Sequence, residues 1–400
     1  MKIIPTICLA AVFASACKPG SPSDEGAVRD SAGVRIVEYN HLESQGATLS
    51  MSNEPLFRYG ELPGDYQFQM IWRGALQPDG SAIVLDARAQ EVLRIDHHGM
   101  SHTVIARNGR GPNEVLRVLG IVVLGQDTVL IEDDGNARIS IFEGNAVSRS
   151  IGLAGDFSIT MGLQILGISE AGQLLMSTSA FSPDFTEPWF AGRLVRFDAE
   201  TGIADTVASF DLARFAPREG PTTPFLPYGQ VAAAQGRFVV ARTDRPEIKW
   251  LSADGVLEQI VRWNPPPVYP TNADWEAFVN GLRMDLRRVN PQMEGAQLQQ
   301  LINRQVERYE LDTGEPMPVF SLLHSDAEGR VWLANFDPVG PLAGVSKYTM
   351  IDHTGKWLGV IEPPETFRFL DAGYGRVLGV MKDQNDVQHV VAFGLETGGL

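Results

Sequence analysis

The chain has 400 residues, with 49 acidic and 33 basic side chains and a formal net charge of −16 at pH 7. This acidic balance argues against a surface that binds nucleic acid or an anionic membrane. After the N-terminal segment, no apolar run reaches the length of about 18 residues that a membrane-spanning helix needs. The 40 glycines and 25 prolines are typical of a chain built largely from turns.

Residues 1–16 are predicted to be a signal peptide, because Lys2 precedes a short apolar segment that ends in small residues before Cys17. Two cleavage modes remain open. The residues before Cys17 resemble a bacterial lipobox, after which the cysteine carries a lipid, and Ala14-Ser15-Ala16 also suits an ordinary signal peptidase. Cys17 is the only cysteine of the exported chain, and a lone cysteine there is natural as a lipid anchor.

Residues 17–29 are predicted to be a flexible tether. The expected product is a cell-envelope lipoprotein that meets the membrane through its lipid anchor only. A residue other than Asp after Cys17 resembles the outer-membrane sorting pattern, so the protein would face the periplasm or the cell surface. The alternative is a soluble periplasmic or secreted protein.

Residues 71–107 form the unit from which the rest of the chain is built. Period-two apolar runs around residues 81–85 and 92–96 indicate strands, and Asp79-Gly80 and His98-Gly99 indicate tight turns. The result is a four-stranded antiparallel meander. A single meander has two faces and two edges to cover, so it needs copies of itself.

Five further copies follow, each marked by a turn glycine between its first two strands: Gly125, Gly172, Gly236, Gly329 and Gly375. Where no insertion intervenes, the turn glycines recur about every 46 residues, which is the period of propeller blades. We therefore predict an all-β chain in which residues 30–400 form a single six-bladed β-propeller of four-stranded antiparallel blades.

The last blade has only three strands of its own, around residues 367–370, 377–381 and 387–395. Residues 33–39 form a strand without an obvious partner. We expect this strand to supply the outer strand of the last blade, because joining the two ends of the chain closes the ring.

The segments DSAGVRIVEYN (30–40) and LFRYGELPGDYQFQMIWRGALQPDGSAIVLDARAQEVLRID (56–96) resemble the bacterial NHL-like six-bladed β-propeller lipoproteins. The link at residues 109–114 matches the pattern of that family in part, with Asn113 in place of a glycine and Val115 in place of an aromatic residue. The resemblance covers most of residues 30–395. It implies an exported propeller and does not specify a chemistry.

Residues 271–318, between blades four and five, have a helical pattern instead. Two apolar stripes predict an αα-hairpin, broken at Pro291, with Asn272 or Asp274 as the first cap. The first stripe is Trp275, Phe278, Leu282, Leu286 and Val289, and the second is Leu298, Leu301, Ile302, Val306 and Tyr309. The segment carries five arginines, which either solvate an exposed face or present positive charge over the pore: Arg283, Arg287, Arg288, Arg304 and Arg308.

Strand order assigns the loops to two faces. The turns between strands one and two and between strands three and four share the first face. The loops between strands two and three, the links between blades and the helical insertion share the second face, which also receives the loop at residues 181–189. Loops on a rigid scaffold favour ligand binding. The candidate ligand-binding residues on the second face are Arg88, Arg110, Asp133, Asp134, Arg138, Arg242, Asp244, Arg245, Asn335 and Asp337.

Two alternatives accompany this candidate site. The acidic residues only make turns, or Asp86, Asp133, Asp244 and Asp337 converge on Ca²⁺, which prefers oxygen ligands. A separate histidine cluster at His97, His98 and His102 falls in a hairpin on the opposite face. No nucleophile elbow, Walker loop or His-Glu-x-x-His motif is present.

No catalytic residue can therefore be assigned from the sequence, and no cofactor is expected apart from that alternative Ca²⁺. The leading functional hypothesis is a binding module for an envelope protein, a peptide or an anionic glycan, with arginines favouring negative charge. The alternative is a calcium-assisted hydrolase or lactonase with a central carboxylate site.

Overall fold

The computed structural model describes residues 26–40, 49–153, 163–179, 189–214, 220–290, 292–340 and 347–397. The predicted signal peptide, Cys17, Pro291 and most of the loop at residues 181–189 lie outside these ranges. None of the helices in this part of the chain is long and apolar enough to cross a membrane.

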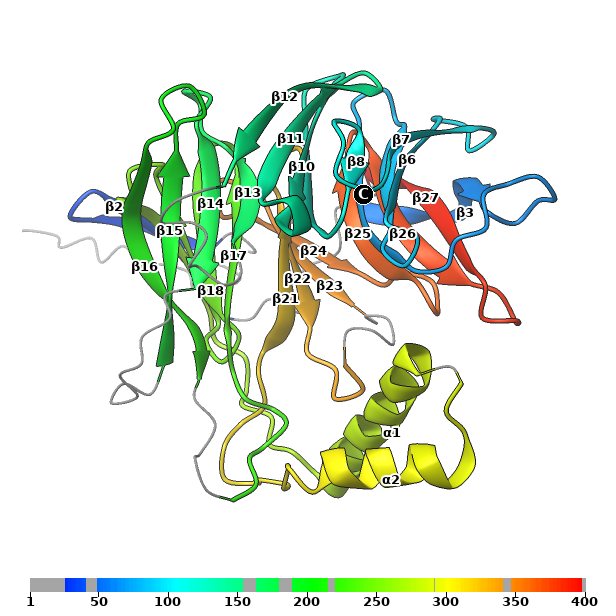
Figure 1. Cartoon of the computed structure of the whole chain (residues 1–400). Helices are drawn as coiled ribbons and strands as arrows, with labels where there is room; N and C mark the ends of the chain where they lie inside the picture. Colours follow the sequence, from blue (N-terminus) through cyan, green and yellow to red (C-terminus); the bar gives the residue numbers. More distant parts are fainter. Residues whose placement is uncertain are drawn as a thin grey trace, which may run out of the picture.

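Six antiparallel sheets form the six-bladed β-propeller predicted from the repeat (Figure 1). Blade one consists of β4 (Ile71–Leu76), β5 (Ala82–Asp86), β6 (Glu91–Ile95) and β7 (His102–Asn108). Blade two consists of β9 (Val118–Leu124), β10 (Thr128–Asp133), β11 (Arg138–Glu143) and β12 (Ala146–Gly152). Blade three consists of β13 (Gln164–Ile168), β14 (Leu174–Ser179), β15 (Trp189–Phe197) and β16 (Ala204–Arg214). Blade four consists of β17 (Gly229–Ala234), β18 (Arg237–Arg242), β19 (Glu247–Leu251) and β20 (Leu257–Trp263). Blade five consists of β21 (Phe320–Ser325), β22 (Val331–Asn335), β23 (Tyr348–Ile351) and β24 (Trp357–Ile361). Blade six consists of β25 (Arg368–Gly373), β26 (Arg376–Lys382), β27 (Gln388–Thr397) and β3 (Leu49–Tyr59). A short strand, β8 (Glu114–Val115), pairs parallel with β7.

The turns between the first two strands of each blade follow the predicted chemistry. Gly80 has φ +84°, a left-handed conformation that glycine adopts without steric cost. The Asp79 carboxylate accepts a hydrogen bond from the Ser81 backbone at 2.9 Å and fixes this turn. The other five turn glycines also have positive φ, so the register of the six repeats is confirmed.

The core lies between neighbouring blades. Strand β5 is buried along its whole length, because both of its faces pack against adjacent sheets. The same holds for most of β10 and β22. The largest fully buried side chains include Trp250 in blade four and Trp332 in blade five. Stacked sheets of this kind hold the inner strands rigidly around the axis.

The ring closes differently from our expectation. The outer strand of blade six is β3, which pairs antiparallel with β27. The strand at residues 33–39 is β2 (Val34–Tyr39), and it pairs parallel with β20 at the edge of blade four. It is followed outward by β1 (Ala27–Ser31), so the last residues of the predicted tether lie in a strand.

The side chains of β2 and β3 account for this correction. The Tyr39 hydroxyl donates to the Gly355 carbonyl and accepts from the Trp357 backbone, both at 2.9 Å, and this binds β2 to the junction of blades four and five. Strand β3 contains Pro55 and few alternating apolar residues, so its pattern does not signal a strand. The expectation about residues 33–39 was therefore wrong, although an N-terminal strand does close the ring.

The insertion between β20 and β21 forms α1 (Asn272–Val289) and α2 (Gly295–Val306), which lie below the blades in Figure 1. The N-cap of α1 is Thr271, which forms a capping box with Asp274; neither Asn272 nor Asp274 is itself the cap. Tyr309 of the predicted second stripe lies beyond the end of α2.

Aromatic contacts attach the insertion to the ring. The Phe278 ring packs edge-on against Phe225, in the link between blades three and four, at 6.2 Å between centroids. Phe225 in turn packs against Phe336, in the loop after β22, at 5.9 Å. Gly281 permits a close approach, because a Cβ there would lie 1.9 Å from the Val339 carbonyl oxygen. Helix α1 is therefore held directly against blade five.

Candidate functional site

Two of the carboxylates predicted as possible Ca²⁺ ligands on the second face accept hydrogen bonds from the backbone instead. The Asp86 carboxylate is fully buried and accepts backbone hydrogen bonds from Gln69 and Met70, before β4, and from Arg88 and Ala89, after β5. Asp133 does the same in blade two, where the donors are Leu116, Arg117 and Asn136. In blades one and two, these carboxylates connect the second strand of the blade to the link that precedes the blade.

Most of the other candidate residues also have partners within the protein. Arg138 donates to the carbonyls of Gly111 and Glu114, and Arg117 pairs with Asp134. Arg242 pairs with Asp244 and Asp211 and stacks over the Trp189 ring. The Asn335 side chain accepts from the Thr349 hydroxyl, and Asp337 accepts from the Val339 backbone.

Three candidate arginines have no side-chain partner in the described ranges, namely Arg88, Arg110 and Arg245. They come from blade one, from the link after it and from blade four. Arg245 and Arg242 line one cavity of about 220 Å³ between blades three and four. The structure therefore distributes the ten candidates around the face.

The carboxylates proposed for Ca²⁺ do not form one donor set. Within the described ranges, no three His, Cys, Asp or Glu side chains come together in a way that could hold a metal ion. Asp86 and Asp133 use their oxygens for backbone N–H groups, and Asp244 pairs with Arg242. Of the histidine cluster, His97 and His98 stack at 3.9 Å between ring centroids. His102 instead shares a hydrogen bond with the Tyr59 hydroxyl.

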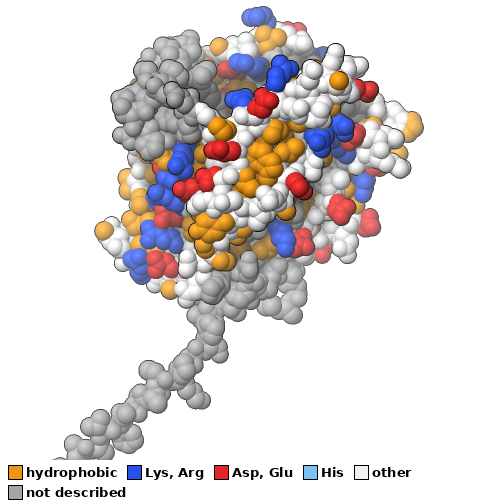
Figure 2. Space-filling model, turned by 90° about the horizontal axis from the view of Figure 1, so that it is seen from below, with side chains coloured by type: hydrophobic (Ala, Val, Ile, Leu, Met, Phe, Trp, Pro, Cys, Tyr) orange, Lys and Arg blue, Asp and Glu red, His pale blue; other side chains and the backbone are white. Residues whose placement is uncertain are grey.

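The helical insertion creates a larger cavity on the second face. It encloses about 960 Å³ between the helices and the rim of blades six and one. Apolar lining comes from Phe68, Met284, Met293, Leu298 and Val387, and polar lining from Gln67, Gln69, Arg287, Asn290, Glu294, Lys382, Asp386 and Gln388. The insertion thus extends from blades four and five across part of the face. Figure 2 views the molecule from this side and shows hydrophobic side chains gathered among scattered charges.

The charged residues around this cavity, the helix-covered cavity, differ in whether they form ion pairs with other described residues. Lys382 pairs with Asp386 at 3.3 Å. The Arg287 side chain is exposed and has no hydrogen bond or ion pair with any other described residue. The Arg288 side chain lies outside the described part of the structure. Among the other insertion arginines, Arg287 is the one that lines the cavity; Arg283 bonds to Asn280, and Arg308 to Gln305.

A second cavity, the central channel, lies on the axis and opens between the first-face turns. It holds about 380 Å³ and is lined by β4, β9, β13, β17, β21, β25 and the residues that follow them. Charged side chains interrupt these otherwise apolar strands, among them Arg73 in β4 and Asp371 in β25. That interruption is the signal in the sequence that could have located this cavity, and our sequence analysis missed it.

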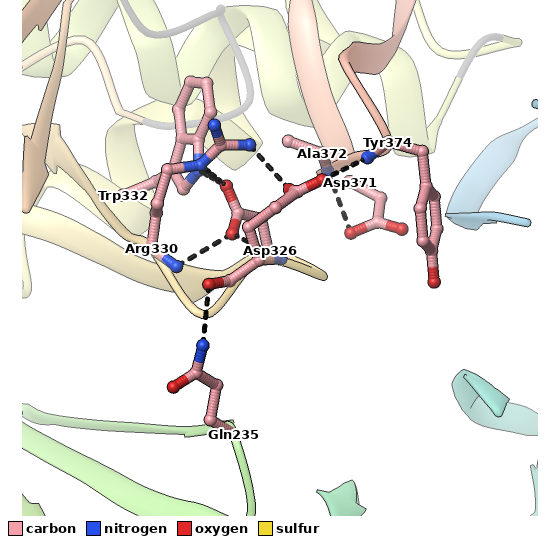
Figure 3. A network of polar contacts seen from close by, with 8 residues as sticks. Gln235, Asp326, Arg330, Trp332, Asp371, Ala372 and Tyr374 are labelled. Carbon is pink, nitrogen blue, oxygen red and sulfur yellow. Dashed lines mark hydrogen bonds and ion pairs between the residues drawn. The ribbon is translucent and has the colours of Figure 1, made fainter. Parts of the chain in front are cut away.

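One wall of the channel carries an acidic network (Figure 3). The buried Asp326 carboxylate pairs with Arg330 at 2.5 Å and accepts from the Trp332 indole at 2.8 Å. Arg330 also pairs with Glu328 at 2.7 Å. Burial raises the pKa of Asp326, while Arg330 and Trp332 act to lower it.

Asp371 stands beside this network without a basic partner in the described structure (Figure 3). Its carboxylate accepts the backbone N–H groups of Leu76 at 2.7 Å and Ala372 at 2.9 Å. Burial raises its pKa to about 7, and the charges of Asp326 and Glu328 act in the same direction. Asp371 is therefore a carboxyl group that titrates near neutral pH.

Two further groups titrate abnormally near the axis. Burial raises the pKa of Glu132 to about 7, although the Ile165 backbone N–H and the charge of Arg73 act to lower it. Burial lowers the pKa of His324 to about 4, and the charge of Arg73 acts in the same direction. Arg73 is thus close enough to influence groups in blades two and five.

Known proteins support the architecture alone. No family model matches the sequence, and no curated protein is similar to it in sequence. A protein from Bacteroides fragilis that is described as exported has 10% identity and a TM-score of 0.51, and the match covers 91% of this chain and all of that one. A gluconolactonase from Xanthomonas campestris has 14% identity and a TM-score of 0.44, with 88% and 99% covered. The calcium-binding protein regucalcin from Agrobacterium tumefaciens has 11% identity and a TM-score of 0.40, with 89% and 98% covered. The chain is a six-bladed β-propeller whose structural neighbours include an exported protein and a lactonase.

Proposed function

We propose that this protein is an exported, lipid-anchored propeller of the NHL-like type that binds a peptide segment of an envelope protein. The helix-covered cavity carries the proposal. At about 960 Å³ it lies at the upper end of the range for ligand pockets, which is about 300–1,000 Å³.

The lining of this cavity suits a peptide. Gln67, Gln69 and Asn290 offer amide donors and acceptors of the kind that pair with peptide groups. Met284 and Met293 provide flexible apolar surface, which adapts to different side chains. Arg287, which has no ion pair with any other described residue, fits a carboxylate on the ligand, since a guanidinium binds a carboxylate through two parallel hydrogen bonds.

Calorimetry with two synthetic probes tests the ligand class. One is an acidic, leucine-containing decapeptide, and the other is the same peptide with each Glu replaced by Gln. We expect binding of the acidic peptide and a loss of about tenfold with Arg287→Ala, the effect of one charge-assisted pair. Arg304→Ala is the matched control, because Arg304 is an exposed arginine of α2 that does not line this cavity.

The outcomes separate the alternatives. Binding that Arg287→Ala weakens and Arg304→Ala leaves unchanged supports the proposal. If the protein binds oligogalacturonate and neither peptide, the ligand is an anionic glycan instead of a peptide. Equal losses with both arginine variants would overturn the assignment of the site.

Export and anchoring have their own test. Cys17, the only cysteine after residues 1–16, follows small residues at the end of the apolar leader. In a bacterial host fed labelled palmitate, we expect label on the full-length protein, and none on Cys17→Ser. Equal labelling of the two forms, or export of unlabelled protein only, contradicts the lipid anchor.

A further inference from the structure

The central channel holds two opposite charges that do not pair with each other. Arg73, on β4, has no hydrogen bond or ion pair with the residues that the structure describes, and its side chain is exposed within the cavity lining. Asp371, on β25, is fixed by two backbone N–H groups and has no basic partner in the same ranges. Unpaired charges in one cavity are costly unless something else compensates them.

The other acids of the channel are already engaged. Asp326 is fully buried beneath Arg330 and Trp332, and Glu328 accepts from Arg330 and from the Tyr374 backbone. Glu132 accepts the Ile165 backbone N–H, is buried and does not line the channel, although its charge acts on Arg73. Of the two carboxylates that line the channel in the described ranges, Asp326 has an ion pair, and Asp371 has hydrogen bonds from backbone N–H groups only. Asp371 is therefore the lining carboxylate that remains available to a cation.

The wall formed by blades two and three differs in character. Strands β9 and β13 line it with apolar side chains, including Leu119, Val122 and Leu166. Each of these strands pairs with one neighbouring strand only, and toward the axis the Ile165 N–H of β13 bonds to Glu132 instead of to a strand. This wall offers apolar contact to a ligand.

We propose that the central channel is a second binding site, independent of the helix-covered cavity, which takes a small apolar amino acid or dipeptide in its zwitterionic form. The ligand carboxylate binds the Arg73 guanidinium, and the ligand ammonium binds the Asp371 carboxylate. The apolar side chain lies against β9 and β13. The volume of about 380 Å³ is near the lower limit for ligand pockets, which excludes longer peptides.

Calorimetry with four small probes tests each charge separately. L-leucine and glycyl-L-leucine carry both charges and distinguish a free amino acid from a dipeptide. N-acetyl-L-leucine lacks the ammonium, and L-leucinamide lacks the carboxylate. We expect one of the two zwitterions to bind at least about tenfold more tightly than either singly charged probe, the minimum value of one charge-assisted contact.

Two variants assign the contacts. Arg73→Gln is expected to weaken binding of the zwitterion about tenfold or more and to leave L-leucinamide unchanged. Asp371→Asn is expected to weaken the zwitterion and L-leucinamide and to leave N-acetyl-L-leucine unchanged. Thermal unfolding of each variant shows whether it is folded. The control is Arg287→Ala, which lies outside the channel and should bind these probes like the unaltered protein.

The results decide between this site and the proposed function. If the unaltered protein binds neither zwitterion, the inference is overturned, whatever the acidic decapeptide does. If Arg73→Gln and Asp371→Asn weaken all four probes equally, the charge assignment is wrong. If Arg287→Ala weakens L-leucine binding, the amino acid occupies the helix-covered cavity instead.

Discussion

The two mouths of this propeller use their charges in opposite ways. On the second face, where the sequence places most acidic and basic loop residues, carboxylates such as Asp86 and Asp133 hold backbone N–H groups and arginines such as Arg138 hold carbonyls. In the central channel, few residues are charged, yet neither Arg73 nor Asp371 has an ion pair in the described structure, although the charge of Glu132 acts on Arg73.

This difference follows from the secondary structure that carries each residue. Loops need their own polar groups satisfied, and Asp or Arg at a loop supplies the missing partner. On the inner strands the two charges differ: Asp371 accepts the backbone N–H groups of Leu76 and Ala372, whereas Arg73 makes no hydrogen bond with the described residues. In this fold, a charge on an inner strand that has no ion pair is therefore a better indicator of a binding site than a charge in a turn.

The largest effect is expected at Asp326, where the channel wall does have a structural charge. Asp326→Ala removes one partner of Arg330, which keeps Glu328, and removes the acceptor of the buried Trp332 indole. We expect a loss of roughly 3–5 kcal/mol in the free energy of unfolding, the cost of breaking a buried ion pair. Chemical denaturation measures it, and Asp326→Asn, which keeps one acceptor, should lose less. Equal stability of Asp326→Ala and the unaltered protein would show that the network contributes nothing.

Asp86 tests the structural reading of the second face. Asp86→Ala leaves four backbone N–H groups without their acceptor, and we expect a loss of about 2–4 kcal/mol in unfolding free energy. Decapeptide binding at the helix-covered cavity should not change. If calcium raises the melting temperature of the unaltered protein but not of Asp86→Ala, the carboxylate is a metal ligand and the structural reading fails.

A substitution at Gly281 tests whether the helix-covered cavity depends on the position of α1. A Cβ at this position would lie 1.9 Å from the Val339 carbonyl, so Gly281→Val must push α1 away from blade five. Overpacking of this kind costs about 1–3 kcal/mol. We expect decapeptide affinity to fall while L-leucine binding in the channel persists. The matched control is Gly220→Val, outside the contact, where nothing lies within 4 Å of the new Cβ, although its φ of +85° adds backbone strain. A parallel loss of both ligands in Gly281→Val would mean that the two cavities are coupled.

Sequence reasoning recovered the blades because the turn glycines recur about every 46 residues wherever no insertion intervenes and strands such as β5 are buried on both faces. It assigned β2 to the wrong blade because a strand's apolar pattern does not identify its partner; the bonds of Tyr39 to the Gly355 and Trp357 backbones do. It missed β3 because Pro55 and polar residues hide the pattern. It also selected loop charges as ligands, since partners such as the Leu116 backbone for Asp133 form only in the folded ring.

The smallest effect concerns protons in the channel. The pKa of Asp371 is raised from 3.8 to about 7 by burial and by the neighbouring acids Asp326 and Glu328. Between about pH 4 and pH 7, the unfolded chain loses this proton while the folded chain keeps it, so the free energy of unfolding falls as the pH rises. The contribution is fully present below pH 4 and is lost above pH 7.

Urea denaturation between pH 4 and pH 7 should show that the free energy of unfolding falls as the pH rises. We expect Asp371→Asn to make this fall smaller by about 1–2 kcal/mol, a value that allows for screening by water that reaches the cavity. Asp96, in the turn after β6, gives the opposite sign. Burial acts to raise its pKa, but hydrogen bonds from Ser101, His98 and Met100 outweigh burial and lower the pKa to about 2. Its contribution is present above about pH 4 and is lost as the pH falls toward 2, so Asp96→Asn should change only the acid limb. If Asp371→Asn leaves the slope between pH 4 and pH 7 unaltered, that carboxyl is ionised in the folded protein, and an ammonium ligand would bind it with no proton released.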